Sequence, residues 1–457
     1  MSTTTVFVII LLCSFCAGSP AEFVLPVVDW LEDYIVGPPV QTQSVLIQMH
    51  TGALIAADLI NNRTFPDILP NTRLILDTKL HYFSPEAGIR ATIEFANEGH
   101  SFIVGYPLSA VSEKTGYLGP VYDIAMLSSL SAVSGLTNDR IYPYFTRCAS
   151  SAADQSLMMK DIIVYYRSLS NGIGWTDVAV ISEVTSVTFD WSENFIAFSE
   201  PELNVVVYRQ FLTGSLEDME LELQQVKLSG ARVILAAVFG EYENFMEIAN
   251  EVGLVGEGYV WITIPTVVSI PFRESSPLSR GSLGVFDSFP PSIEQEKFIE
   301  AWQHPEFAKY PDAGPGTRPS PLAFRPFDMI MAAALAIGEM DAQGRLDSGE
   351  RISAQDWTDV IRNISFQGVS GELSFDLSGN RIGGQELYNY LPDTNQWVSV
   401  GTWSLAEGLQ IKKDVIWFSN TTEIPDLDIR EPFDYWSCHD KEKGHDETGK
   451  KINLESP

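Results

Sequence analysis

Arg232-Val-Ile-Leu-Ala-Ala-Val-Phe239 is a nearly continuous apolar run, which is typical of a strand that helices cover on both faces. A helical pattern over 216–226 precedes this run and ends at Gly230, and a second amphipathic stretch, 243–252, follows it. The next apolar run, Tyr259-Val-Trp-Ile-Thr263, predicts another strand. Because strand and helix alternate roughly every 27 residues here, we expect right-handed crossovers and a parallel sheet.

The N-terminal half repeats this alternation. Strands are predicted at 44–47, 74–76 and 101–104, and helices at 54–60 and 85–97. A chain of 457 residues is longer than one hydrophobic core usually serves. We therefore expect an α/β protein with two compact units, each built on a parallel sheet of the same style.

The composition is that of a well-packed globular protein, since 45% of the residues are hydrophobic and 19% are charged. The charge balance is strongly acidic, because 29 Lys and Arg face 60 Asp and Glu and leave a net charge of −31. Such a field repels phosphate backbones. We therefore expect no nucleic acid among the partners of this chain.

Residues 1–21 carry no charged side chain and hold a short apolar centre followed by small residues. This pattern predicts a secretory signal peptide cut before Glu22, and a buried N-terminal helix is the alternative. The later apolar runs, 259–272 and 329–337, are too short or too interrupted by proline to span a bilayer. We expect a secreted or extracellular chain, which meets a membrane only through a segment that this sequence does not contain.

Only two cysteines, Cys148 and Cys438, remain after the predicted signal peptide. They can form one disulfide bridge, stay as separate thiols or link two chains, and the sequence leaves these alternatives open. Three Asn-x-Ser/Thr triplets, at Asn62, Asn363 and Asn420, predict N-glycosylation of an exported eukaryotic chain.

Several segments resemble a known protein family in their residues and in their order along the chain. Among them are Leu136-Thr-Asn-Asp-Arg-Ile-Tyr-Pro-Tyr-Phe-Thr-Arg147, Gly172-Ile-Gly-Trp-Thr-Asp-Val-Ala-Val180 and Phe366-Gln-Gly-Val-Ser-Gly-Glu-Leu-Ser-Phe-Asp-Leu-Ser-Gly-Asn-Arg381. Together they resemble the type I periplasmic-binding-protein-like (Venus flytrap) ligand-binding region of eukaryotic receptors, over residues 44 to about 425. The tail Ile416-Trp-Phe-Ser-Asn-Thr-Thr-Glu-Ile-Pro425 is most similar to GABA type B-like class C G-protein-coupled receptors.

The resemblance implies two doubly wound lobes joined by three crossovers, with ligand held in the cleft between them. Lobe 1 would comprise 44–150 and 290–370, lobe 2 would comprise 151–289 and 371–425, and 426–457 would be a polar tail. A ligand that touches both lobes stabilises their closed arrangement, which would be the signal. The resemblance also implies a small polar ligand, such as an amino acid or a relative, and a dimer formed through lobe 1.

Polar residues follow two predicted strands of lobe 1, at the sheet edge where open α/β sheets bind ligands. By resemblance to amino-acid receptors, Ser109, Ser131 and Ala132 would present hydroxyl and N–H donors to a ligand carboxylate. Tyr106 stands where the family has a small residue and would partly fill the pocket. The residues alone leave a second interpretation open, in which the serines are turn formers and helix caps.

The corresponding candidates of lobe 2 are Glu183 and Thr185 after one predicted strand, and Glu241 and Tyr242 after another. An acidic side chain at this edge would suit a ligand ammonium group. Glu241 is equally well explained as a solvated carboxylate at a helix start. We expect Asp328 to make a structural contact at the start of its helix.

Catalytic motifs are absent from the sequence, which contains neither a nucleophile elbow nor a Walker A loop nor a His-Glu-x-x-His zinc motif. The six histidines fall singly, so we expect neither an enzyme nor a metal or other cofactor. The predicted function is that of an extracellular ligand-binding domain of a receptor. The alternative is a secreted solute-binding or decoy protein that does not signal.

Overall fold

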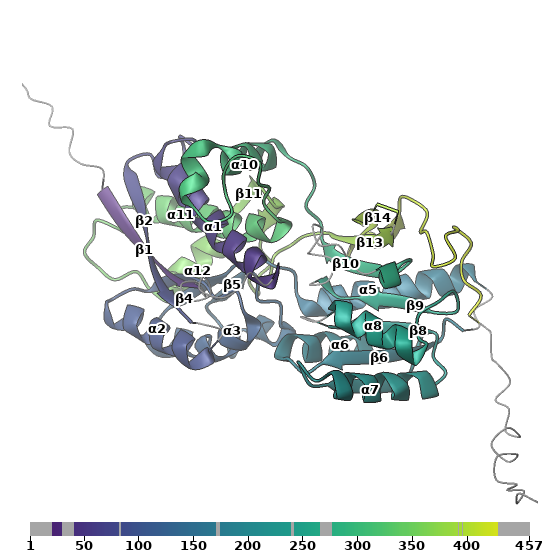
Figure 1. The fold of residues 1–457 in the computed structure, drawn as a ribbon. Helices are drawn as coiled ribbons and strands as arrows, with labels where there is room; N and C mark the ends of the chain where they lie inside the picture. Colours follow the sequence, from purple (N-terminus) through teal and green to yellow (C-terminus); the bar gives the residue numbers. More distant parts are fainter. Residues whose placement is uncertain are drawn as a thin grey trace, which may run out of the picture.

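The computed structural model describes residues 21–29, 41–81, 84–170, 174–238, 242–265, 277–391, 393–394 and 396–427. Within them the chain forms two large sheets, and Figure 1 shows the bodies built on these sheets lying side by side. We name the body on the first sheet lobe 1 and the body on the second sheet lobe 2. The predicted α/β fold with two lobes is confirmed.

The sheet of lobe 1 has the strand order β2-β1-β3-β4-β5, and every neighbouring pair is parallel. Its strands are β1 (Ala21–Asp29), β2 (Thr72–Leu80), β3 (Phe102–Gly105), β4 (Ala125–Ser128) and β5 (Phe145–Arg147). The chain winds first to one side of β1 and then to the other. The carboxyl ends of β1, β3 and β4 therefore form the edge at which such sheets bind ligands.

Helices cover both faces of this sheet, and α1 packs along α11. Their long contact is made of small and aliphatic side chains, which include Ala56, Ile60 and Ile330 in the core of lobe 1. The helices of lobe 1 are α1 (Gln41–Asn61), α2 (Pro85–Asn97), α3 (Ser109–Thr115), α4 (Leu118–Tyr122), α10 (Ile293–Gln303), α11 (Phe324–Ala342) and α12 (Ala354–Arg362), with short 3-10 turns at η2 (Ser134–Thr137), η4 (Pro305–Lys309) and η5 (Pro321–Ala323).

The sheet of lobe 2 has the order β15-β14-β13-β10-β9-β8-β6-β7. The strands from β10 to β7 are parallel, and β13, β14 and β15 add an antiparallel extension. The strands are β6 (Asp177–Glu183), β7 (Asn204–Phe211), β8 (Val233–Ala237), β9 (Val260–Thr263), β10 (Leu283–Asp287), β13 (Gln385–Leu391), β14 (Gln396–Ser404) and β15 (Gly408–Ile411). The helices are α5 (Ala152–Leu169), α6 (Ser186–Ser199), α7 (Leu216–Leu228) and α8 (Tyr242–Val252), with a 3-10 turn at η3 (Pro277–Ser279).

The helix starts predicted in both lobes are confirmed by their caps. The hydroxyl oxygen of Ser215 accepts the N–H of Asp218 at 3.3 Å, and that of Ser353 accepts the N–H of Asp356 at 3.1 Å. Gly230, with a φ of +74°, follows the end of α7 in the left-handed conformation that glycine adopts without strain.

The chain passes between the lobes three times, after β5, after β10 and before β13. A small hairpin precedes the last passage and is made of β11 (Ser365–Gly368) and β12 (Gly371–Ser374). Leu373 and Phe375 belong to the core of lobe 1. The hairpin therefore packs with lobe 1, although the predicted boundary after residue 370 gave β12 to lobe 2.

The strand predicted at 44–47 is wrong, because these residues lie inside α1. A four-residue apolar run has no period that separates a strand from part of a buried helix. The first strand of lobe 1 is instead β1, which pairs with β2 along all nine of its residues. Lobe 1 thus begins before residue 44. The predicted signal peptide, except for Ala21 at the start of β1, lies outside the described residues.

One helical stretch of the described residues, Pro321–Ala342, has the length and apolar composition needed to cross a membrane. In this structure, 83% of its most apolar window is buried inside the protein. The stretch contains η5 and α11, and its position against α1 makes it the central helix of lobe 1.

Candidate functional site

Four of the predicted site residues lie together at the carboxyl edge of the lobe 1 sheet. Tyr106 follows β3 with a φ of +46°, and its carbonyl oxygen accepts hydrogen bonds from the hydroxyls of Ser112, Ser128 and Ser131 at 3.0, 2.8 and 2.8 Å. The phenol is fully buried in the core of lobe 1, where its oxygen lies 2.9 Å from the hydroxyl of Thr92. The expectation that Tyr106 partly fills the ligand pocket is therefore wrong, because its side chain points into the lobe.

Ser109 begins α3 and faces the loop that follows β4. Its hydroxyl oxygen accepts the backbone N–H groups of Ala132 and Val133, at 3.1 and 3.4 Å. In the described part of the chain, no acceptor is bonded to the hydroxyl proton of Ser109. Because two N–H donors polarise this hydroxyl, its proton is well suited to an anionic acceptor.

Ser131 and Ala132 use their polar groups mainly to hold the loop. The hydroxyl of Ser131 contacts the Tyr106 carbonyl and lies 2.6 Å from the hydroxyl of Ser112. Ala132 donates its N–H to Ser109, and its carbonyl accepts the N–H of Ala152 at 2.7 Å, the first residue of α5. These bonds place both residues beside Ser109 and join lobe 1 to lobe 2. Their role as direct ligand contacts stays a prediction.

Glu183 and Thr185 lie together at the carboxyl end of β6. The carboxylate of Glu183 is buried and accepts the hydroxyl of Thr213 at 2.6 Å. Thr185 is the cap of α6, since its hydroxyl oxygen accepts the N–H of Thr188 at 3.2 Å. Thr185 therefore has a structural role as a helix cap, and its role as a ligand contact stays a prediction.

Tyr242 is the first residue of α8 and is buried, with its ring stacked on Phe245 at a centroid distance of 6.3 Å. Burial raises the pKa of its phenol to about 12, and the hydroxyls of Ser279 and Ser282 lie near enough to oppose that rise. Among the described residues, no hydrogen bond of good geometry reaches these three hydroxyls. Glu241 lies outside the described residues.

A bidentate contact joins the lobes beside the loop that carries Ser131 and Ala132. The carboxylate of Asp190, on α6, accepts the N–H and the hydroxyl of Ser134, each at 2.7 Å. Asn194, one turn further along α6, donates to the same Ser134 hydroxyl at 3.2 Å. Ser134 follows the loop that carries Ser131 and Ala132, so the contact ties the predicted site of lobe 1 to a helix of lobe 2.

A buried ion pair joins the lobes at the second passage of the chain. Arg325 at the start of α11 contacts Asp287 at the end of β10, and both side chains are at most 4% exposed. Burial opposes ionisation of Asp287, yet the guanidinium groups of Arg325 and Arg381 keep the pKa of its carboxyl below the usual value. Gln155 of α5 donates to the same carboxylate at 3.3 Å.

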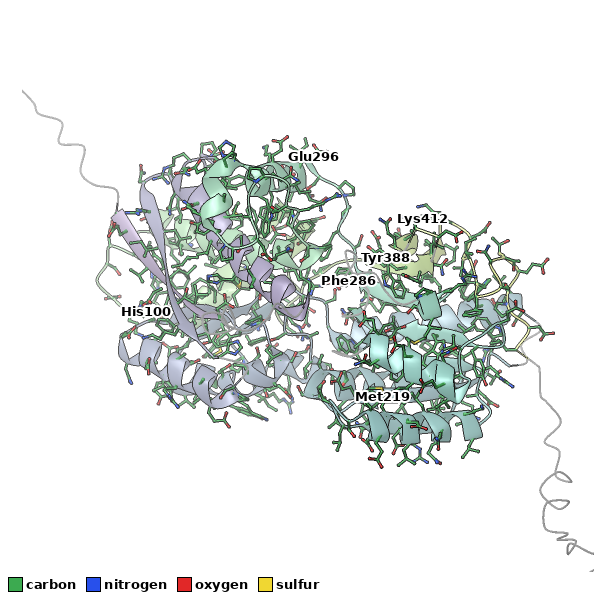
Figure 2. All side chains as sticks on the ribbon, in the orientation of Figure 1. His100, Met219, Phe286, Glu296, Tyr388 and Lys412 are labelled. Atoms are coloured by element: carbon green, nitrogen blue, oxygen red, sulfur yellow. The ribbon has the colours of Figure 1, made fainter. Side chains whose placement is uncertain are left out.

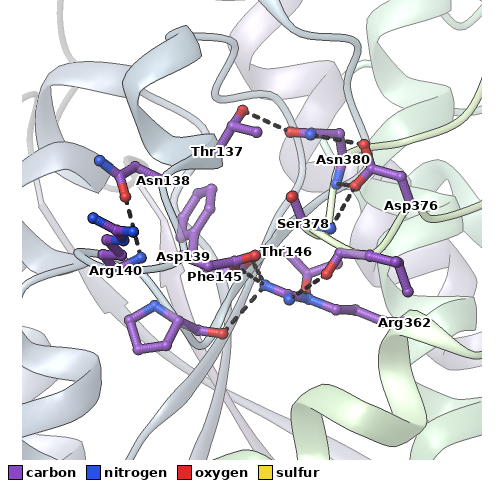
Figure 3. Close-up of polar contacts among 12 residues, drawn as sticks. Thr137, Asn138, Asp139, Arg140, Phe145, Thr146, Arg362, Asp376, Ser378 and Asn380 are labelled. Atoms are coloured by element: carbon purple, nitrogen blue, oxygen red, sulfur yellow. Dashed lines mark hydrogen bonds and ion pairs between the residues drawn. The ribbon is translucent and has the colours of Figure 1, made fainter.

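A second polar network fastens the third passage to lobe 1. The buried guanidinium of Arg147 contacts Asn380, and it also donates to the carbonyl of Val133 at 2.7 Å. Figure 3 shows how Arg362, at the end of α12, reaches both the 137–146 loop and the turn that holds Asn380. Arg362 donates to the carbonyl of Leu377 at 2.7 Å and to Asp139 at 3.1 Å. This part of the chain is therefore anchored to lobe 1.

Apolar side chains of both lobes meet in one hydrophobic cluster. Most of its buried members belong to the core of lobe 2, Phe286 among them, and Met49 and Leu322 join it from lobe 1. Half-buried side chains pack against it, and these include Ile47, Leu108 and Leu130 from lobe 1 and Tyr388 from lobe 2. Figure 2 shows Phe286 and Tyr388 on the side of lobe 2 that is nearest to lobe 1. We name this set the interlobe cluster.

Asp190, Asp287 and Arg325 were not among the residues predicted from the sequence. A single Asp inside a helix or at a strand end is a common feature, and its partner lies far away in the chain. No local pattern could have identified these residues. Asp328, by contrast, makes the structural contact that was expected, because its carboxylate accepts the N–H groups of Val369 and Ser370 at 2.8 Å.

The three predicted glycosylation positions, Asn62, Asn363 and Asn420, are all exposed. An oligosaccharide could be attached at each without displacing the core. Cys148 is fully buried in lobe 1, and burial raises the pKa of its thiol. Its possible partner, Cys438, lies outside the described residues.

The polar groups of this region are suited to binding. Among the described residues, no cluster of three or more His, Cys, Asp or Glu side chains could hold a metal ion. Lobe 1 offers one polarised hydroxyl at Ser109, and lobe 2 offers a buried carboxylate at Glu183. Such groups hold a small polar molecule through hydrogen bonds.

Comparison with known proteins agrees with this geometry. Residues 48–393 match the receptor family ligand binding region. GABA type B receptor subunit 1 of Mus musculus is 25% identical over 369 residues, which are 72% of this chain and 36% of that receptor. Glutamate receptor 2.3 of Arabidopsis thaliana is 23% identical over 308 residues, covering 63% of this chain and 32% of the relative.

Metabotropic glutamate receptor-like protein E of Dictyostelium discoideum is 22% identical over 379 residues, covering 80% of this chain and 44% of the relative. The chain thus spans less than half the length of each of these three proteins. They are receptors and not enzymes, in agreement with the predicted absence of catalysis. Since the family match covers most of the two-lobed body, this chain belongs to the receptor family ligand binding region, as its segments predicted.

Proposed function

We propose that this chain is the extracellular ligand-binding domain of a receptor and binds a small carboxylate, such as an amino acid or a relative, between its lobes. The observation that carries the proposal is the hydroxyl of Ser109. It is polarised by two N–H donors, keeps its own proton for a ligand and lies at the carboxyl edge of the lobe 1 sheet. Leu130, on the adjoining loop, adds a backbone N–H that has no acceptor among the described residues.

The signal in this proposal is the closing of the two lobes. A ligand held by Ser109 on lobe 1 and by side chains of lobe 2 favours the closed arrangement by its difference in affinity for the closed and open forms. The contact between Ser134 and Asp190 already joins the lobes beside the site. A bound molecule therefore adds to an existing contact and does not have to create one.

The test of the proposal is ligand-dependent closure. Small-angle X-ray scattering of the full chain, titrated with a panel of amino acids and small carboxylates, should show a smaller radius of gyration with at least one of them. Ser109→Ala should weaken the binding of that compound by about tenfold, because the substitution removes a hydrogen bond to a charged group. Ser348→Ala, an exposed serine of lobe 1, is the matched control. If no compound of the panel binds, the proposed function is wrong.

We also propose that the chain dimerises through lobe 1. Two large apolar side chains are exposed at the short helix α4, namely Tyr117, which directly precedes it, at 51% and Val121 at 73%. A partner copy would cover them. Val121→Asp should then lower the mass measured by light scattering to that of a monomer, whereas Leu228→Asp, on α7 of lobe 2, should leave the mass unchanged. A monomeric mass for the unaltered chain at micromolar concentration would refute this part.

A further inference from the structure

We propose that Arg147 is a positioning residue of the candidate site and gives Ser109 the positive charge that an anionic ligand needs. The inference rests on the proposed function and assigns to it a residue that the ligand does not touch. It comes from one peptide group, between Ser131 and Ala132, which lies between the guanidinium of Arg147 and the hydroxyl of Ser109.

Arg147 is the last residue of β5, at the carboxyl edge of the lobe 1 sheet, and it is 1% exposed. Its Nε donates to the side-chain oxygen of Asn380 at 2.8 Å, and its Nη2 donates to that oxygen and, at 2.6 Å, to the hydroxyl of Thr137. Its Nη1 donates to the carbonyl oxygens of Val133, at 2.7 Å, and of Ser131, at 3.4 Å. The guanidinium is therefore fully hydrogen-bonded, and all of these acceptors are uncharged.

The guanidinium of Arg147 keeps its charge although it is buried. Burial lowers its pKa to about 10, so it is protonated at neutral pH. The carboxylates of Asp154, Asp190 and Asp376 attract it from a distance, but none of the described carboxylates accepts a hydrogen bond from it. Buried charges are usually paired with an opposite charge in contact. The charge of Arg147 is not cancelled in this way, so it is available to a bound anion.

The peptide group between Ser131 and Ala132 connects this charge to Ser109. Its carbonyl oxygen accepts Nη1 of Arg147, and its N–H, on Ala132, donates to the hydroxyl oxygen of Ser109 at 3.1 Å. A donor at the carbonyl strengthens the N–H of the same peptide, because hydrogen bonds in a chain polarise one another. The hydroxyl of Ser109 then donates its own proton to the ligand. Three successive hydrogen bonds thus lead from the cation to a carboxylate bound at Ser109.

The surroundings of Ser109 would otherwise repel an anion. The chain as a whole has a net charge of −31. Asp190 lies beside the same loop, and Asp29, at the end of β1 on the same sheet edge, is hydrogen-bonded to His50 at 2.8 Å. A cation a few hydrogen bonds away changes the affinity for a carboxylate by about tenfold. Arg147 is therefore the charge that offsets these carboxylates at Ser109.

The experiment neutralises Arg147 without removing it. Thr137 is half-buried, accepts a hydrogen bond from Arg147 and donates one to Asn380 at 3.0 Å (Figure 3). Thr137→Asp places a carboxylate against the guanidinium, and Thr137→Asn fills the same space without a charge. Calorimetry on the full chain measures the dissociation constants of L-glutamate, L-alanine and 4-aminobutyrate. The probe that binds most tightly should bind Thr137→Asp about tenfold more weakly than Thr137→Asn.

A second pair of variants changes the charge at Arg147 itself. Arg147→Lys keeps a cation, and Arg147→Met removes it at nearly the same size. The probe should bind the Lys variant about tenfold more tightly than the Met variant. Ser348→Asp, which adds a carboxylate at an exposed position of lobe 1, controls for net charge and should bind like the unaltered chain. A melting curve verifies that each variant is folded, and the Thr137 pair decides if Arg147→Met does not fold.

The outcomes separate this inference from the proposed function. A purely structural role of Arg147 predicts equal affinities within each folded pair, because the members of a pair fill the same space. Equal affinities in either folded pair would therefore overturn the inference while the proposed function stands. If none of the three probes binds the unaltered chain at about 10 mM, the proposed function fails and the inference fails with it. Weaker binding by the more negative member of each pair supports the inference.

Discussion

The carboxylate of Asp190, in lobe 2, accepts two hydrogen bonds from Ser134, in lobe 1, one from its N–H and one from its hydroxyl, each 2.7 Å long. The pair lies directly beside the loop that carries Ser131 and Ala132. Its geometry means that any rotation of the lobes away from each other at this point breaks two charge-assisted bonds at once.

Asp190→Ala should therefore loosen the contact between the lobes. Hydrogen bonds to a charged group contribute about 2 kcal/mol, so the free chain should populate more open arrangements. Small-angle scattering should show a larger radius of gyration in the absence of ligand. Asp347→Asn, which alters an exposed aspartate of lobe 1, should leave the radius unchanged. An equal radius for Asp190→Ala and the unaltered chain would show that this contact does not hold the lobes.

Replacing only one member of the ion pair of Asp287 and Arg325 should lower the free energy of unfolding strongly. Arg325→Met leaves a buried carboxylate without its nearest cation, and we expect a loss of about 3 kcal/mol in the free energy of unfolding. The double variant with Asp287→Asn should lose less than the sum of the two single variants. Urea unfolding of all four proteins measures the coupling. Additive losses would mean that the two groups do not stabilise each other.

The stability of lobe 1 should depend on pH through His81. Burial lowers the pKa of this fully buried imidazole from its ordinary value of 6.5 to about 4. Between about pH 4 and pH 6.5, the unfolded chain therefore binds a proton at His81 that the folded chain does not bind. Stability is complete above pH 6.5 and falls by about 3 kcal/mol as the pH drops towards 4.

His81→Gln removes this titration. The difference in unfolding free energy between the variant and the unaltered chain should change across that interval in favour of the variant. His304→Gln, at an exposed histidine, should run parallel to the unaltered chain. Denaturation at a series of pH values measures all three proteins. Parallel curves for His81→Gln and the unaltered chain would contradict the prediction.

Gly368 should not tolerate even a methyl group. A Cβ at this position would lie 2.5 Å from the buried carboxylate of Asp328, which holds the N–H groups of Val369 and Ser370. Gly368→Ala should therefore cost about 1–3 kcal/mol in the free energy of unfolding, because it overpacks a rigid site. Gly258→Ala, where the nearest atom is 3.9 Å away, is the matched control and should cost less than 1 kcal/mol. Equal melting temperatures for the two variants would show that the Asp328 contact can yield.

Local sequence patterns are sufficient to predict the alternation of strands and helices in both lobes. The apolar run 232–239 and the amphipathic stretch 243–252 are local signals, since each depends only on residues near it in the chain. The short run 44–47 was misread because four residues contain no period. The strand β1 begins at Ala21, where the predicted signal peptide ends, so its apolar residues directly continue an apolar leader pattern.

The use of the predicted site residues, by contrast, depends on contacts between distant parts of the fold. Serine after a strand has the same local signal whether it binds a ligand or a carbonyl group. The fold directs Ser131 to the carbonyl of Tyr106 and leaves Ser109 with a proton to donate. It also brings Asp287 to Arg325 and Asp190 to Ser134, over 38 and 56 residues of chain. Such pairs have no local pattern, because their free energy arises only when distant elements pack together.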